Sequence, residues 1–259
     1  MSDLIWLDEA DPQFPDTNTA LDDPNGLLAV GGALTVKSIL KAYTKGIFPW
    51  FSENQPILWW SPSPRMILDP SDIHCSRSLR KLSRKKLFTI TVDTAFEEVI
   101  DHCADIERPD QEGTWITEDM REAYVALYNK GYAHSIEAWQ DSHLVGGLYG
   151  IALGGVFFGE SMFSLVSGAS KMAFATLAQQ LKAWQFTLID CQIHTPYLES
   201  FGAREVERSQ FEERLSSALN GFQFSECENI QNDEHSFSKK SRWGAWTQTE
   251  YGFGDQFSS

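Results

Sequence analysis

Three apolar segments in succession decide the fold: residues 134–140 (HSIEAWQ), 143–154 (HLVGGLYGIALG) and 156–164 (VFFGESMFS). Branched and aromatic side chains recur in all three, and only one or two residues separate each segment from the next. This pattern is typical of strands that follow one another along a chain. We expect three consecutive antiparallel strands here.

Further regular segments flank these strands on both sides. Those before them are a strand at 66–68, a helix at 71–85, a strand at 87–93, and helices at 94–103 and 117–131, the last capped by Thr117. Those after them are a helix at 168–184, a buried strand at 186–193 (FTLIDCQI), and helices at 196–200 and 209–219. This order predicts an α+β fold in which helices pack on a sheet, and we place this domain at residues 65–224.

The two ends of the chain have a different character. Residues 1–64 are rich in turns, prolines and aromatics, which predicts a small irregular N-terminal domain that is mostly loop over 14–34, with a helix capped by Thr35. Pro62 and Pro64 mark its boundary. Residues 225–259 are polar, and we expect a partly disordered tail. The alternative is that its aromatic residues, Trp243, Trp246, Tyr251 and Phe253, pack back on the body.

Composition excludes several classes of protein. The chain has 259 residues, of which 42% are hydrophobic and 22% charged, the balance of an ordinary globular protein. It has no apolar run of the roughly 18 residues that a membrane-spanning helix needs, and its acidic N-terminus differs from a signal peptide. The four cysteines are scattered. We therefore expect a reduced, cytoplasmic protein with no disulfide framework and no metal site.

Charge is distributed unevenly along the chain. The net charge of −15 argues against binding nucleic acid, because phosphate groups repel an acidic surface. Residues 77–86 (RSLRKLSRKK) are nevertheless densely basic, without an acidic residue among them. Helical spacing predicts one basic helix face, which is either a local anion site or simply a solvated helix. The basic residues are Arg77, Arg80, Lys81, Arg84, Lys85 and Lys86.

Two polar residues interrupt the buried strand at 186–193. Alternation puts Asp190 and Gln192 on one face, with Cys191 facing the other way as an inert buried thiol. Polar groups inside a strand are unfavourable unless they are bonded or functional. Sequence physics alone leaves two interpretations open, a catalytic pair or a hydrogen-bonded structural pair. Glu160, which follows an apolar run, is a second candidate.

A resemblance to a known family rests on short motifs in a fixed order. In chain order they are FPDTNTALDDPNGLLAVGGAL (14–34), GIFPWF (46–51), ILWWSPSPR (57–65), GTWIT (113–117), GYAHSIE (131–137), GGLYG (146–150), GESMFS (159–164), ASK (169–171) and LIDCQ (188–192). Together they resemble the leucyl/phenylalanyl-tRNA–protein transferases from about residue 14 to 220. The chain departs from that family at Leu148, where methionine is frequent.

The resemblance implies a fold and an activity. The larger domain would be a GNAT-like (acetyltransferase-like) mixed sheet with helices. The enzyme would transfer Leu or Phe, and less well Met, from aminoacyl-tRNA to proteins that begin with Arg or Lys, which marks them for N-end-rule degradation. Neither a cofactor nor a metal is expected, and the partners would be aminoacyl-tRNA and the acceptor protein, with no membrane.

The resemblance also assigns roles to residues of this chain. Gln192 would contact the attacking amine, and Asp190 would orient Gln192, so that these two are the catalytic residues. The basic segment would bind tRNA. The remaining substrate-binding residues would be Glu160, Trp50, Trp115, Leu148, Phe157, Ser161, Met162, Phe174 and Ile189.

Two other function classes stay open. A GNAT-type acetyltransferase that uses acyl-CoA is disfavoured, because its Gly-containing acyl-CoA loop is replaced by LVSGASK at residues 165–171. A non-catalytic tRNA-binding module would use the basic segment alone.

Overall fold

The computed structural model describes residues 4–106, 116–219, 222, 243 and 246. Its larger sheet has seven strands. In spatial order they are β11 (Arg204–Val206), β5 (Arg65–Leu68), β10 (Leu188–Gln192), β9 (Val156–Ser164), β8 (His143–Leu153), β7 (Ala133–Gln140) and β6 (Thr89–Val92). Strands β9 and β10 run parallel, whereas the other neighbouring pairs run antiparallel. The three consecutive strands expected at residues 134–164 are thus confirmed as β7, β8 and β9.

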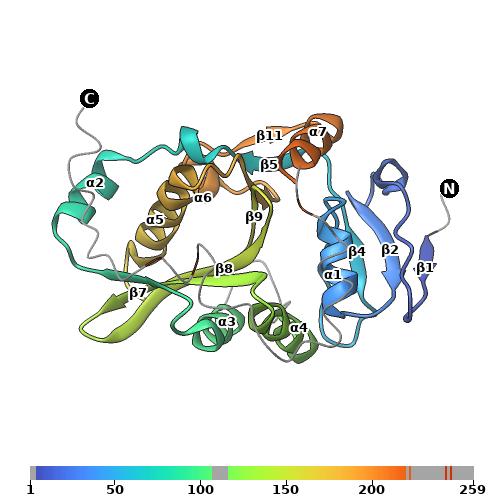
Figure 1. Cartoon of the computed structure of the whole chain (residues 1–259), viewed down its shortest axis with the longest axis horizontal. Coiled ribbons are helices and arrows are strands. Elements are labelled where there is room, and N and C mark those ends of the chain that lie inside the picture. The colour runs from blue at the N-terminus through green and yellow to red at the C-terminus, as the bar shows by residue number, and fades with distance from the viewer. Residues whose placement is uncertain (1–3, 107–115, 220–221, 223–242, 244–245, 247–259) are drawn as a thin grey trace.

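Helices cover both faces of this sheet (Figure 1). Helix α5 (Ala169–Ala183) packs on one face over β7 and β8, and α3 (Phe96–Asp105) and α4 (Glu118–Asn129) pack on the other. The Thr117 side chain accepts the Met120 backbone N–H at the start of α4, which confirms the predicted cap. The predicted fold class, an α+β mixed sheet with helices beside a small N-terminal domain, is confirmed.

The N-terminal region is more regular than predicted. Four strands form a small sheet in the order β1 (Ile5–Leu7), β2 (Leu27–Gly31), β4 (Leu58–Trp60) and β3 (Phe48–Pro49), beside α1 (Val36–Tyr43). The expectation of a mostly looped segment at 14–34 is therefore wrong for β2. Turn residues flank this strand closely, but its leucines are buried between β1 and β4, and that tertiary pairing overrides the local turn signals.

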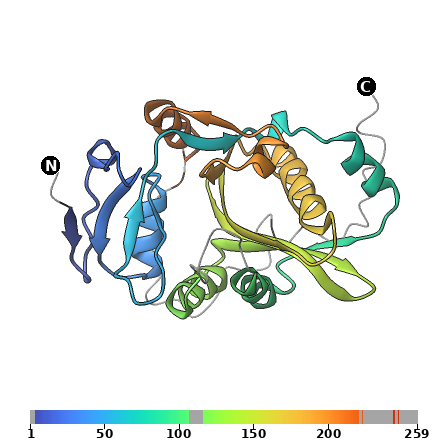
Figure 2. The same cartoon turned by 180° about the vertical axis from the view of Figure 1, so that it is seen from behind.

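The basic segment forms a shorter helix than predicted. Helix α2 (Arg77–Arg84) begins after Ser76, whose hydroxyl accepts the Leu79 N–H, and residues 70–72 form a separate 3₁₀ turn that starts at Pro70. Figure 2 shows α2 and the four-stranded sheet at opposite ends of the molecule. The short helix α6 (Pro196–Glu199) and the helix α7 (Arg208–Ala218) are the last two helices in the described part of the chain.

One hydrophobic core joins the two sheets. It includes Leu28 and Trp59 from the small sheet, Ile151 and Phe158 from the large one, and Phe211 from α7. Gly46, at φ +74°, lets the chain that follows α1 pass close to α7, because a Cβ there would lie 2.5 Å from the Phe211 ring. Helix α7 therefore helps to hold the small sheet against the large one.

A second core lies between the large sheet and α5, and a tail residue completes it. Trp243 is buried there and packs beside Trp184, with Trp246 next to it. The alternative that tail aromatics pack back on the body is thus confirmed for these two, while Tyr251 and Phe253 lie outside the described residues. Cys75, Cys103 and Cys191 are buried free thiols.

Candidate active site

A cavity of about 690 Å³ opens where β9 and β10 separate. The parallel pairing of the two strands ends at Phe158 and Asp190, and the residues that follow on each strand line the cavity. The N-terminal region contributes Phe48 and Trp50 to its wall, and α6 contributes Tyr197. The cavity thus lies between the two sheets.

Most of the predicted substrate residues meet in this cavity. One part of its wall is apolar, and another carries a carboxyl and an amide group. The predicted residues that line it are Trp50, Leu148, Phe157, Glu160, Ser161, Met162, Phe174, Ile189 and Gln192. Trp115 lies outside the described residues. The roles of these residues remain proposals, but the structure brings them together.

Glu160 is the carboxyl group of the cavity wall. Its two oxygens accept O–H groups from Tyr43 of α1 and Tyr124 of α4, each at 2.7 Å, and the two hydroxyls are themselves 2.7 Å apart. Burial raises the pKa of Glu160 to about 7, and the hydrogen bonds from Tyr124 and Tyr43 only partly offset this effect. The carboxyl group can therefore gain or lose a proton near neutral pH.

The two tyrosines are functional candidates that the sequence analysis missed. Burial raises the pKa of Tyr43 and of Tyr124 well above the ordinary value, and the nearby Glu160 charge adds to the effect. They remain protonated donors as a result. Each occupies the buried face of a predicted helix, and such a position alone did not distinguish it from an ordinary core residue.

Gln192 reaches the same carboxyl group from the other strand. Its side-chain N–H donates to Glu160 over 3.3 Å, and its backbone has φ +61°, which is uncommon for a residue with a side chain. A bulge lies here, because β10 advances from Asp190 to Gln192 while its partner β5 advances by one residue. The bulge places Gln192 on the cavity wall.

The predicted facing of Asp190 is wrong for the same reason. Simple alternation does not hold across a bulge, and Cys191 and Gln192 both line the cavity, whereas the buried Asp190 points away toward β5. One Asp190 oxygen accepts the backbone N–H of Gln192 at 2.9 Å. Asp190 therefore holds the backbone of Gln192 rather than its side-chain amide.

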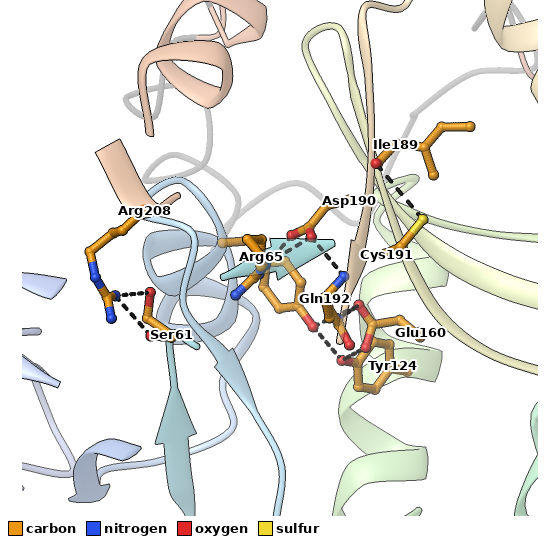
Figure 3. A network of polar contacts seen from close by, with 10 residues as sticks. Ser61, Arg65, Tyr124, Glu160, Ile189, Asp190, Cys191, Gln192 and Arg208 are labelled. Atoms are coloured by element: carbon orange, nitrogen blue, oxygen red, sulfur yellow. Dashed lines mark hydrogen bonds and ion pairs between the residues drawn. The ribbon is translucent and has the colours of Figure 1, made fainter. Parts of the chain in front are cut away.

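Arg65 is the main partner of Asp190 (Figure 3). The sequence analysis did not identify this residue. Its Nε and Nη2 donate to the two oxygens of Asp190 at 2.9 and 2.7 Å, and the exposed side-chain fractions are 1% and 0%. The guanidinium carbon lies 4.8 Å from the Phe48 ring centroid and 4.7 Å from that of Phe211. A single arginine beginning an apolar strand, RMIL, was the signal that could have identified it.

Cys191 is a buried thiol as predicted, although it lines the cavity beside Gln192 instead of facing the other way. It is buried, and burial raises the pKa of its thiol while the Asp190 charge raises it further. The thiol therefore stays protonated and is a poor nucleophile.

The basic helix is not part of the cavity wall. Arg77, Lys81 and Arg84 are exposed on α2, whereas Arg80 is half-buried and donates through Nε to the Cys75 carbonyl at 3.0 Å. Leu82 of α2 lies against Gly168 at the start of α5, and Phe174 of α5 lines the cavity. The basic surface is therefore joined to the cavity by one helix.

Within the described ranges, no group of three or more His, Cys, Asp and Glu side chains is arranged to hold a metal ion. The helices in those ranges also include none that is long and apolar enough to span a membrane.

Comparison with protein families identifies two matches. Residues 67–216 match the family described as leucyl/phenylalanyl-tRNA protein transferase, and residues 32–63 match the N-terminal domain of that family. Curated relatives from several organisms carry the same description. The protein from Saccharophagus degradans is 59% identical over 219 residues, 85% of this chain and 90% of the relative. The protein from Stutzerimonas stutzeri is 54% identical over 216 residues, 83% of this chain and 95% of the relative.

Solved structures give only loose likenesses. The L-PGS of Bacillus licheniformis matches with a TM-score of 0.36 at 13% identity, over 58% of this chain and 55% of that one. A GCN5-related N-acetyltransferase from Kribbella flavida matches with a TM-score of 0.32 at 15% identity, over 63% and 58%. The fold class rests on the strand order described above.

Proposed function

This chain belongs to the leucyl/phenylalanyl-tRNA–protein transferase family, and on that basis we propose its substrates and the residues that act on them. The enzyme is a transferase that moves an aminoacyl group from tRNA to a protein. In our proposal the group is Leu or Phe, and less well Met, and the acceptor is the α-amino group of a protein that begins with Arg or Lys. The product would enter N-end-rule degradation, and the reaction would take place in the cytoplasm.

The chemistry requires little more than positioning. The amine nitrogen bonds to the ester carbonyl carbon, the bond from that carbon to the ribose oxygen breaks, and a proton passes from the amine to the ribose oxygen. The ester is already activated, and an α-amine with a pKa of about 7.7–8.0 is partly neutral at physiological pH. Holding the two substrates together can remove roughly 7–11 kcal/mol of the barrier. The proposed reaction therefore uses neither ATP nor a cofactor.

Glu160 and Gln192 are the proposed groups around the amine. The side-chain carbonyl of Gln192 would accept a hydrogen bond from the amine, and the ionised Glu160 beside it would take the proton. The pKa of about 7 for Glu160 lies close to that of the amine, which suits proton transfer between them. The observation that carries the proposal is this partly buried carboxyl group at the wall of a largely apolar cavity.

The apolar part of the cavity would receive the aminoacyl side chain. Leu148, Met162, Phe174 and Ile189 form it together with Phe157, and they offer no polar partner to a hydrophilic side chain. Trp50, also on the wall, would stack with the terminal adenine of the tRNA. Glu160 would also favour an acceptor with a basic first residue.

Asp190 would act by positioning. Its contact with the Gln192 backbone holds the bulge, and the charge of Arg65 compensates its own. We therefore revise the role that the resemblance gave to Asp190, from orienting the Gln192 amide to fixing the strand that carries it.

A transfer assay tests the proposal. Purified protein is given tRNA charged with radiolabelled Leu, Phe or Ile and a peptide that begins with Arg, without ATP or CoA. We expect label from Leu and Phe to reach the peptide. Transfer from Ile should be much slower, because branching at Cβ makes this side chain widest next to its backbone, where we expect the pocket to exclude the extra methyl group. One misplaced methyl group is worth about 1–3 kcal/mol.

Two arms of the assay distinguish the alternatives. A peptide that begins with Ala replaces the Arg peptide, and acetyl-CoA replaces charged tRNA. Acetylation without aminoacyl transfer would identify an acetyltransferase, and tRNA binding without either reaction would identify a non-catalytic module. Equal rates with Leu and Ile would refute the pocket assignment.

A further inference from the structure

Trp243 is a buried tryptophan beyond residue 216, where the family match ends. Only 6% of its surface is exposed. Its ring stacks on His134 with 3.9 Å between centroids and an interplanar angle of 8°, and the Trp184 and Phe186 rings meet it edge-on. Trp243 thus fills a slot beside the C-terminal end of α5.

Phe157 lies between this slot and the cavity. Its ring centroid is 6.1 Å from that of Trp243, and Phe157 also lines the cavity. Beneath it is Gly150, where a Cβ would lie 2.6 Å from two Phe157 ring atoms. Because Gly150 pairs with His134 across β7 and β8, the two rings lie side by side, Trp243 over His134 and Phe157 over Gly150.

This arrangement restricts where the Phe157 ring can go. Protein interiors are packed to crystal-like density, so a buried ring moves only into space that a neighbour leaves. The sheet blocks movement toward Gly150, and Trp243 blocks movement toward His134. Phe157 also forms part of the cavity wall, so a displacement of its ring changes the shape of the cavity.

We propose that Trp243 is a specificity-determining residue, which fixes the depth of the apolar pocket by holding Phe157 in place. The inference rests on the proposed function, in which this pocket receives the aminoacyl side chain. Trp243 touches neither substrate and sets the relative rates of Leu and Phe transfer through Phe157.

Replacing the indole tests this inference. In Trp243→Ala the Phe157 ring can move over His134, and the pocket becomes deeper. The larger Phe side chain then gains relative to Leu, and we expect the ratio of kcat/KM for Phe-tRNA to that for Leu-tRNA to rise roughly tenfold. In Trp243→Phe, which keeps an aromatic ring in the slot, the ratio should stay within about twofold of the wild type.

Two further variants make the result specific. Trp246→Ala removes the neighbouring tail indole, whose ring packs on Trp184 and Trp243, and it should change the ratio much less. In a Phe157→Leu background, Trp243→Ala should no longer change the ratio, because the group through which it acts is gone.

The ratio separates specificity from stability. A lower Tm with an unchanged Phe-to-Leu ratio in Trp243→Ala would reduce Trp243 to a structural residue and overturn the proposal. If Trp243→Ala does not fold, Trp243→Leu, which keeps part of the volume, is measured for the same ratio. Wild-type protein that transfers neither amino acid would instead contradict the proposed function.

Discussion

Glu160 combines a position on the cavity wall, where we propose that the reacting groups meet, with a proton affinity that folding creates. An isolated glutamate loses its proton well below neutral pH, and burial moves the pKa of this one to about 7. The folded state therefore binds a proton that the unfolded state has released between about pH 4.5 and 7. This difference has consequences for stability as well as for activity.

The stability consequence has a definite sign. For a carboxyl group whose pKa is raised by folding, the contribution is fully present below the unfolded pKa and is lost as pH rises through about 7. We expect the free energy of unfolding of the wild type to fall by about 3 kcal/mol relative to Glu160→Gln across this window. Urea unfolding of both proteins at several pH values between 4.5 and 7.5 measures this difference. Parallel plots of the free energy of unfolding against pH for the two proteins would contradict the raised pKa.

Glu160→Gln also tests the proposed proton transfer. The amide keeps the shape of the side chain but cannot accept the proton, and we expect kcat to fall by about 10²- to 10⁴-fold, the usual contribution of a general base. The measurement uses saturating Leu-tRNA at pH 8. A variant that keeps wild-type kcat would exclude Glu160 as the base.

Substitutions at Asp190 and at Gln192 should have different effects, the first mainly on stability and the second mainly on kcat, although the two residues are only two positions apart. In Asp190→Asn the buried Arg65 charge loses its partner, and we expect the free energy of unfolding to fall by about 3–5 kcal/mol. The double variant Arg65→Leu/Asp190→Leu removes both charges. We expect its free energy of unfolding to fall by less than the sum of the decreases in the two single variants, Arg65→Leu and Asp190→Leu. Gln192→Ala should lower kcat and leave the unfolding midpoint near that of the wild type, since its side chain lies at the cavity wall.

Urea unfolding and the transfer assay are run on the same samples of each variant. Full stability together with lost turnover in Asp190→Asn would restore the direct catalytic role that the resemblance first suggested.

At the scale of single elements, local signals predicted helices well and strand geometry less well. Thr35 and Thr117 cap α1 and α4 as expected, because a cap depends on residues within one turn. The bulge in β10 depends on its pairing with β5, more than a hundred residues earlier in the chain, and no local pattern reports it. The bulge is why the predicted facing of Asp190 was wrong, whereas most of the predicted site residues do lie around one cavity and their roles stay predictions.

Helix α2 is the element whose role can be tested alone. Its exposed cations make it the proposed contact for the tRNA phosphates, and each phosphate contact contributes to the salt dependence of binding. In Arg77→Ala/Lys81→Ala/Arg84→Ala we expect weaker tRNA binding, with a slope of log K against log salt that is shallower by about two to three.

A charge-matched control accompanies this triple variant. Replacing Lys37, Lys130 and Lys182 by Ala removes the same charge from other parts of the surface and should leave the slope nearly unchanged. Equal slopes in both triple variants would mean that α2 acts only through net charge.

At the scale of the whole molecule, the composition and the order of segments were enough to predict the fold class. They were not enough to predict how the two sheets meet. The N-terminal strands are two to five residues long and lie among prolines, so the sequence predicts loop for them. Their strand structure depends on pairing, as between β2 and β4. The boundary near Pro62 and Pro64 remains a prediction. The strands on either side of it, β4 and β5, belong to different sheets, although the sheets share one core.

That shared core sets an order of events during synthesis on the ribosome. Phe211 of α7 packs beside Gly46 and Arg65, so both the small sheet and the Arg65–Asp190 pair are incomplete until the chain has been made beyond residue 211. At about 5–20 residues per second, the N-terminal strands wait roughly ten seconds or more for this helix. Fragments released early would carry Tyr43 and Glu160 without the packing that brings them together, and the nascent chain would acquire its active site only near the end of translation.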